Sequence, residues 1–347
     1  MFTAVFFDLK MMGLFSMLFG AGVLLYAGKS AAGEAAPTGL WFRRMAALLA
    51  IGLVHAYLIW NGDILVPYAL CGFILLWWVR NLSARALLAG GIIMLLIGAF
   101  LNAGQVFAWE SMSEADRAAQ LEMMAPTPEQ VEQQLQTMRG SYTGLVASRA
   151  QFTLLGQTIF FAMFFLWRCG GMMLIGMALY KYGFLDGRLS PGLYARTTVA
   201  CVLVGVTLSS YGFVALEGMR FATPDRALAD SWNYAGAVFT SVGYAGALLY
   251  PVTANLMPGL RRRLAAVGRM AFTNYLSHSV ITAVLFLGWG FGLAGRFDYA
   301  DQLGVVAAIW ILQLIVSPIW LARFRFGPAE WLWRSLTYGR WQPFVRG

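Results

Sequence analysis

The chain has 347 residues, of which 59% are hydrophobic and only 12% are charged, whereas a soluble domain carries about 25% charged residues. So few charged residues cannot supply the polar surface that a soluble protein of this size needs. Most of the exposed surface must therefore contact lipid. The net charge of +9 does not indicate a nucleic-acid partner, because the basic residues are scattered between apolar runs. The sequence predicts an all-α, polytopic integral membrane protein that does not bind nucleic acid.

Nine apolar runs approach the roughly 20 residues that a helix needs to span the hydrocarbon layer. We predict one transmembrane helix for each run, packed as a bundle in a single membrane domain over residues 1–347. In the first helix, glycines 13, 20 and 22 are expected to allow close helix packing. The runs cover residues 11–28, 45–61, 64–80, 86–108, 152–180, 194–216, 233–255, 270–294 and 303–323.

The loops on alternate sides of this predicted bundle differ in charge. One side, with the residues at its helix ends, holds 17 of the 25 basic residues and only three of the 16 acidic ones. Cytoplasmic loops show this excess of Lys and Arg. We therefore predict a cytoplasmic C-terminus and an N-terminus outside. The basic side comprises residues 29–44, 81–85, 181–193, 256–269 and the tail from 323.

Two polar segments lie outside the predicted spans. Residues 110–150 fall on the extracytoplasmic side, where Ser113 and Thr127 are typical helix N-caps and predict two short amphipathic helices. A lid over an outer cavity is the alternative to a plain surface excursion. In the tail 326–347, tryptophans alternate with arginines, which predicts a cytoplasmic interfacial helix.

Three ionisable residues interrupt the apolar runs, and they are His55, Arg168 and His278. A charged side chain at mid-bilayer costs at least about 2.5–3.5 kcal/mol, so each should face a partner or a water-filled cavity. A rise of 1.5 Å per residue places them roughly 15, 18 and 12 Å from the inner ends of their helices. We predict that they share one layer and treat them as catalytic candidates. The alternatives are packing roles with satisfied hydrogen bonds for His55 and His278, and a structural ion pair for Arg168.

Polar neighbours extend this candidate site along its helices. Asn274 lies four residues before His278 and therefore on the same helix face, which must point into the bundle. We expect Asn274 to bind substrate, and the alternative is a hydrogen bond between helices. The two histidines have no third ligand at their depth, so we predict no metal site.

A tight turn is predicted where the second helix meets the third. It is formed by Trp60-Asn61-Gly62-Asp63 and is followed by Tyr68. Trp60, Asp63 and Tyr68 are expected to bind substrate at the mouth of the site, and the alternative for Asp63 is a purely structural turn residue. Asp63 follows His55 by one and a half to two turns, so we expect no direct contact between them.

Several stretches resemble the bacterial YeiB-type family of multi-spanning membrane proteins, from end to end of the chain. The resemblance implies a multi-pass protein of the bacterial cytoplasmic (inner) membrane with ten helices. The family's extra first helix carries an Asp-x-Leu-Arg-Gly-like motif, and we expect either that it lies upstream of this sequence or that this variant lacks it. His278 stands where the family more often has Gln. The matching stretches are residues 14–22, 52–56, 60–65, 68–72, 176–181, 273–276 and 326–339.

This family is distantly similar to acyltransferases that move an acetyl group across a membrane. In the segment Phe7-Asp8-Leu9-Lys10, the resemblance implies a catalytic role for Asp8, and we expect Lys10 to contact substrate. The similarity also implies acyl-CoA as co-substrate, no bound cofactor, and a glycan or lipid acceptor in the bilayer. A homo-oligomer is compatible with the sequence.

Three functions remain open. A transmembrane acyltransferase needs a general base, for which His55 or His278 is the candidate, and an oxyanion donor, for which Arg168 or Asn274 is the candidate. A transporter or permease would use broken helices, and Gly170-Gly171 is the one candidate break. A non-catalytic scaffold or lipid-binding protein would tolerate substitution of all three ionisable residues.

Overall fold

The computed structural model describes residues 2–28, 37–124, 126–218 and 224–346, and these ranges are helical apart from turns and one isolated antiparallel bridge between Phe324 and Val345. The all-α prediction is confirmed. Lys29 and Glu34, in the predicted cytoplasmic loop 29–44, lie outside the described residues. The chain divides into two compact units, which are described separately here; the single domain predicted over 1–347 stays a prediction.

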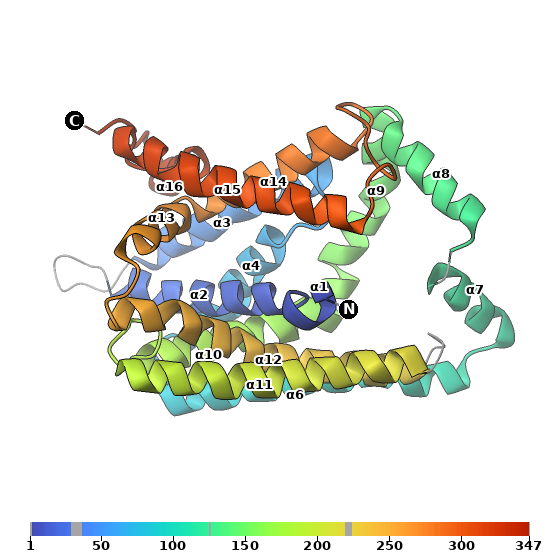
Figure 1. Cartoon of the computed structure of the whole chain (residues 1–347), viewed down its shortest axis with the longest axis horizontal. Helices are drawn as coiled ribbons and strands as arrows, with labels where there is room; N and C mark the ends of the chain where they lie inside the picture. Colours follow the sequence, from blue (N-terminus) through green and yellow to red (C-terminus); the bar gives the residue numbers. More distant parts are fainter. Residues whose placement is uncertain (1, 29–36, 125, 219–223, 347) are drawn as a thin grey trace. The chain divides into compact units, whose positions relative to one another are not determined.

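Unit 1 comprises Met1–Ala36, Leu70–Ala125 and Thr158–Leu256. In Figure 1 its long helices run alongside one another, with α11 beside α12 and α10 beside both α2 and α6. Its helices are α1 (Phe2–Phe6), α2 (Lys10–Ala27), the π-helix η2 (Gly72–Leu76), α5 (Trp77–Val79), α6 (Ala84–Ser111), α7 (Glu114–Met124), the π-helix η3 (Phe161–Phe165), α10 (Leu166–Lys181), α11 (Pro191–Gly218) and α12 (Pro224–Thr253).

Unit 2 comprises Pro37–Ala69, Pro126–Gln157 and Met257–Gly347. Within it α16 packs on α3, α13 packs on α15, and α9 and α14 both contact the π-helix η1. Its helices are α3 (Thr38–Val54), η1 (His55–Ile59), α4 (Leu65–Cys71, which crosses into unit 1), α8 (Pro128–Arg139), α9 (Tyr142–Gln157), α13 (Pro258–Arg269), α14 (Ala271–Phe286), α15 (Tyr299–Arg323) and α16 (Pro328–Tyr338).

Seven helical stretches among the described residues are long and apolar enough to cross a membrane, so the chain has the character of a multi-pass membrane protein. Each overlaps one of the nine predicted spans. The other two predictions correspond to shorter helices, Leu65–Val79 and the 16-residue α14. The count of nine is therefore not confirmed. The seven stretches are Phe2–Ala27, Thr38–Ile59, Ala84–Gly104, Tyr142–Lys181, Pro191–Val214, Asp230–Thr253 and Tyr299–Arg323.

Unit 1 is held together by close backbone approaches at glycines. A Cβ on Gly20 would overlap the carbonyl of Met173, and a Cβ on Gly176 would overlap the backbone of Met17, so α2 and α10 cross at van der Waals contact. The packing predicted for Gly20 is confirmed, and Gly13 is also tightly surrounded. The prediction for Gly22 is not confirmed, because no atom of the described residues lies within 4 Å of its Cβ position.

Three π-helical turns, η1, η2 and η3, interrupt the apolar helices. Such turns are rare and often occur at functional sites. The helix break predicted at Gly170-Gly171 is wrong, because α10 is continuous through both residues. Gly171 instead packs against the carbonyl of Gly91 on α6 at 2.9 Å from its Cβ position, so this pair serves helix packing.

The helix starts predicted in the polar segment 110–150 are confirmed. The Ser113 hydroxyl accepts the Asp116 N–H at 3.2 Å, at the start of α7. Thr127 and Gln130 form a capping box at the start of α8, with Pro128 at the first helical position. These starts were readable because capping depends on residues only three apart in the sequence.

The predicted tail helix is α16, which lies against α3 in unit 2. The Trp333 indole donates to the carbonyl of Arg44 at 2.9 Å, and the Arg44 guanidinium lies 3.8 Å from the Trp333 ring centroid. The ring of Trp331 stacks on that of Trp341, with centroids 5.0 Å apart. The tail is thus an ordered part of unit 2; its cytoplasmic side stays a prediction.

Candidate functional site

The candidate site forms where α3 changes into a π-helix. The Trp60 N–H donates to the His55 carbonyl at 2.8 Å, across five residues instead of four. The backbone is then extended at Trp60 and bends at Asn61 and Gly62 before α4 begins at Leu65. The wider turn and the bend return the chain toward the helix it has just left, so the residue after the bend can reach His55.

That residue is Asp63, and it forms a buried pair with His55. Asp63 Oδ1 lies 2.7 Å from His55 Nδ1, and the two side chains are 2% and 1% exposed. The expectation that they are too far apart for contact is wrong, because it assumed a regular helix followed by an outward turn. The other oxygen, Asp63 Oδ2, accepts the Val66 N–H at 2.7 Å and so fixes the carboxylate to the first turn of α4.

The second imidazole nitrogen of His55, Nε2, differs from the first. His55 Nε2 is buried and has no hydrogen-bond partner among the described residues. Buried polar atoms are nearly always paired in proteins, so an unpaired one needs an explanation such as a catalytic role or an unseen ligand or water. This nitrogen is the most distinctive atom of the site.

Tyr275 on α14 packs against the His55 side chain and binds the backbone next to Asp63. Its hydroxyl accepts the Ile64 N–H at 3.2 Å, and its ring lies 5.2 Å from the His55 ring, tilted by 48°. Together with Asp63, it satisfies backbone donors at the start of α4. Sequence reasoning did not select Tyr275, although it lies beside Asn274 in the polar stripe from which the site was predicted.

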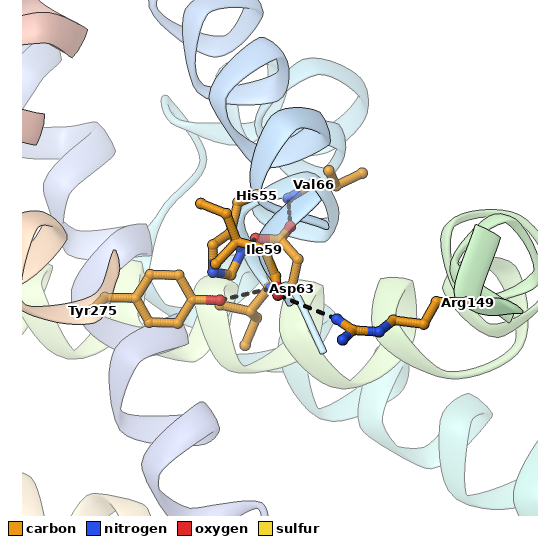
Figure 2. A network of polar contacts seen from close by, with 7 residues as sticks. His55, Ile59, Asp63, Val66, Arg149 and Tyr275 are labelled. Carbon is orange, nitrogen blue, oxygen red and sulfur yellow. Dashed lines mark hydrogen bonds and ion pairs between the residues drawn. The ribbon is translucent and has the colours of Figure 1, made fainter. Parts of the chain in front are cut away.

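Helix α9 supports the site by capping the end of the π-helix. The Tyr142 hydroxyl donates to the Leu58 carbonyl at 2.8 Å, and Arg149 Nη1 donates to the Ile59 carbonyl at 3.2 Å. Figure 2 shows Arg149 reaching Ile59 next to Asp63, with Tyr275 approaching on the other side of His55. A cation at a helix C-terminus is favourable because unpaired carbonyls gather there. Arg149 was not selected from the sequence because no local pattern links it to His55.

The other predicted residues of unit 2 are only partly brought together. Trp60 is 39% exposed and Tyr68 is 6% exposed. Asn274 donates its amide to the Val267 carbonyl at 3.1 Å and to the Ser317 hydroxyl at 3.2 Å, which uses both of its protons in helix packing. Among the described residues, no hydrogen bond links the half-buried His278 to His55.

In unit 1, Arg168 is completely buried without a carboxylate among the described residues. Its Nη1 donates to the Tyr234 carbonyl at 2.8 Å, and its guanidinium lies 4.4 Å from the Tyr234 ring centroid. Nε, Nη2 and the Tyr234 hydroxyl are buried without a partner in the described part of the chain. Among the described residues, the Arg168 guanidinium is therefore held by a carbonyl and an aromatic ring and not by an ion pair.

Lys10 and Asp8, the two candidates near the N-terminus, differ in environment. Lys10 is fully buried at the start of α2, and its Nζ donates to the Ala4 carbonyl at 2.7 Å and to the side-chain oxygen of Asn233. Asp8 is exposed in the turn between α1 and α2. Since these residues and Arg168 belong to unit 1 while His55 belongs to unit 2, the predicted common layer stays a prediction.

The described residues contain no group of three His, Cys, Asp or Glu side chains placed to hold a metal ion. The thiols of Cys71 and Cys169 are buried and that of Cys201 is partly buried, and all three are free. The polar groups around His55 are a buried imidazole–carboxylate pair with hydrogen-bond donors at the end of η1. An imidazole held by a carboxylate can accept or donate a proton.

Comparison with known proteins identifies relatives over nearly the whole chain. The chain is 33% identical over 356 residues to the uncharacterized protein YeiB of Escherichia coli (strain K12), which covers 96% of this chain and 84% of the relative. The chain belongs to the YeiB-type family. It is also 30% identical to the uncharacterized protein YxaH of Bacillus subtilis (strain 168), over 98% of this chain and 82% of that relative.

The family's profile and a more distant relative agree with this assignment. Residues 179–340 match the family described as "Protein of unknown function (DUF418)". An uncharacterized 39.9 kDa protein of Bacillus acidopullulyticus is 26% identical over 99% of this chain and 84% of its own length. No solved structure matches the chain. These YeiB-type relatives are bacterial.

Proposed function

We propose that this YeiB-type protein is a transmembrane acyltransferase of the bacterial cytoplasmic membrane, with His55 as its general base. The observation that carries the proposal is the buried pair of His55 with Asp63, which leaves Nε2 without a partner. Enzymes that activate a hydroxyl or an amine often use such an imidazole, with one nitrogen held by a carboxylate and the other available to accept a proton.

The carboxylate of Asp63 sets the protonation of the imidazole. When Asp63 accepts a hydrogen bond from Nδ1–H, the lone pair is left on Nε2, where it can take a proton. Asp63 is itself fixed by the Val66 N–H, and the Tyr275 ring packs against the imidazole. The base therefore has a defined tautomer and orientation before substrate binds.

In the proposed reaction, His55 Nε2 removes a proton from the acceptor's hydroxyl or amine as that oxygen or nitrogen attacks the acyl carbonyl of acyl-CoA. The new C–O or C–N bond forms and the C–S bond breaks. The imidazolium then returns the proton to the departing thiolate, so no oxidant or reductant is needed. General-base catalysis of this kind contributes about 10²–10⁴-fold to a rate.

The proposal keeps the predicted orientation, with a cytosolic acyl-CoA donor and an extracytoplasmic or lipid-linked acceptor. Asn274 is a poor choice for the oxyanion donor, since its amide protons are already used. Arg168 keeps two unpartnered donor atoms in unit 1, and its role in this reaction stays a prediction.

The test is acyl transfer by the full chain in detergent, measured as thiol release from acetyl-CoA with water or a sugar amine as acceptor. His55→Ala and His55→Gln are expected to lower the rate by about 10²-fold or more, with unchanged elution on gel filtration. His278→Gln is the matched control and should keep most of the activity. Full activity in both His55 variants would refute the role of His55 as general base. Absence of thiol release by the wild type with every acceptor class would refute the acyltransferase activity.

A proton-coupled transporter is the second candidate, and the three π-helical turns in apolar segments favour it. Buried His and Asp residues in membranes also serve as proton relays, so the His55–Asp63 pair fits this function as well. Uptake into proteoliposomes driven by a pH gradient, without acyl-CoA and lost in His55→Gln, would favour the transporter over the acyltransferase.

A further inference from the structure

A groove in unit 2, remote in sequence from His55, combines arginines with apolar side chains. It has a volume of about 590 Å³ and lies between α13 and α15. Its walls are Gly259, Arg262 and Arg263 on α13 and, on α15, the apolar residues Ile315, Pro318, Ile319 and Ala322.

The two walls follow helix periodicity. On α13, the lining residues are spaced i, i+3 and i+4, and on α15 they are spaced i, i+3, i+4 and i+7, so each set forms one helix face. The helices are joined beside the groove by the buried residues Ala266, Met270 and Leu321. The groove therefore runs along two packed helices, with arginines on its α13 side and apolar residues on its α15 side.

The described residues that line this groove include two arginines and no acidic side chain. Residues 257–270 contain four arginines and no acidic residue. Arg262 and Arg263 are exposed, and so are Ile315 at 46% and Ile319 at 67%. A loop that needed positive charge only for topology would not have to place two arginines along an apolar channel. The arrangement calls for a ligand with an anionic end and an apolar body.

The groove lies close to one end of α15. Ile315 and Ala322 lie within roughly 12 Å of the end of α15 at Arg323, at a rise of 1.5 Å per residue. Both this end and α13 fall on the side predicted to be cytoplasmic. Basic pockets between helices on that side of a membrane bind anionic lipid head groups.

We propose that the α13–α15 groove binds an anionic phospholipid of the cytoplasmic leaflet. The phosphate lies against Arg262 and Arg263, and an acyl chain lies along Ile315, Pro318 and Ile319. Arginine suits the phosphate because its planar guanidinium donates two parallel hydrogen bonds to paired oxygens. Lipid bound there links α13 to α15 and so stabilises unit 2. The inference is independent of the proposed acyltransferase activity.

The experiment measures lipid binding to the full chain in detergent by native mass spectrometry, with phosphatidylglycerol and phosphatidylcholine as probes. Wild type should bind phosphatidylglycerol more tightly than phosphatidylcholine. The double variant Arg262→Gln/Arg263→Gln should weaken phosphatidylglycerol binding about 30-fold, at about 1 kcal/mol for each arginine. Its affinity for phosphatidylcholine should stay unchanged.

The matched control is Arg85→Gln/Arg196→Gln, which removes two exposed arginines of the same predicted side outside the groove. It should leave phosphatidylglycerol binding unchanged. Ala322→Trp fills the groove without changing its charge and should also weaken binding. Equal losses in both double variants, or unchanged binding in Arg262→Gln/Arg263→Gln, would overturn the site. Displacement of the lipid by millimolar inorganic phosphate would show a phosphate site instead and would also overturn it.

Discussion

The two units of this protein bury their polar groups in different ways. In unit 2 the buried His55 has a carboxylate partner, and that carboxylate is itself fixed by a backbone N–H. In unit 1 the buried Arg168 contacts a carbonyl and an aromatic ring and has no carboxylate partner among the described residues, while α2 and α10 cross at glycines. The comparison suggests that a polar network determines the local structure of unit 2, whereas backbone packing determines that of unit 1.

Asp63→Ala tests the polar network of unit 2 and has the largest expected effect. It removes the partner of two buried groups, the Val66 N–H and His55 Nδ1. The free energy of unfolding should therefore fall by about 3–5 kcal/mol. The free energy of unfolding is measured by graded SDS titration. Asp63→Asn keeps an acceptor for Val66 and should lose less than half as much. Equal losses in the two variants would show that the network does not depend on this acceptor.

Gly20→Ala tests the packing of unit 1. The new Cβ would overlap the Met173 carbonyl, and because backbone cannot rotate away, α2 and α10 must separate at a cost of about 3 kcal/mol. The same titration measures the effect. Gly22→Ala lies on the same helix, at a position with no described residue within 4 Å of the new Cβ, and should be neutral or stabilising by up to about 1 kcal/mol. Similar behaviour of the two variants would contradict a glycine contact between the helices.

These expectations also show what the sequence could and could not predict. The membrane class and the helix starts at Ser113 and Thr127 depend on composition and on residues three apart, so they were predictable. The contact of His55 with Asp63 was not, because a π-turn and a bend alter the geometry that a regular helix would give. Tyr275 and Arg149 reach the site from 211 and 90 residues away from their hydrogen-bond partners, and no local pattern encodes such contacts.

Tyr275→Phe sharpens the comparison with a smaller change in unit 2. It removes the acceptor of the Ile64 N–H but keeps the ring against His55, so stability should fall by about 1–2 kcal/mol. A double-mutant cycle with Asp63→Asn measures whether the two side chains act together, since both satisfy donors at the start of α4. Strict additivity would mean that they stabilise the turn independently and that the polar network is not one unit.

Arg168→Met has the smallest expected effect and bears most directly on unit 1. The substitution removes one hydrogen bond to the Tyr234 carbonyl and one contact with its ring. It also removes two buried donors that lack acceptors among the described residues, and leaving such groups unpaired is itself costly. The opposing terms should nearly cancel, so the free energy of unfolding should change by about 1 kcal/mol or less. Tyr234→Phe, which deletes a buried hydroxyl without a hydrogen-bond partner among the described residues, is the companion variant and should be neutral.

A loss of several kcal/mol in Arg168→Met would show that the guanidinium holds unit 1 together, and the comparison between the units would fail. A stable Arg168→Met variant that has lost acyl transfer would have the opposite meaning. It would show that Nε and Nη2 are kept unpaired for a ligand, because a purely structural arginine with unchanged stability cannot affect the reaction. Arg168→Lys distinguishes charge from geometry in that case, since lysine keeps the charge but not the planar donors.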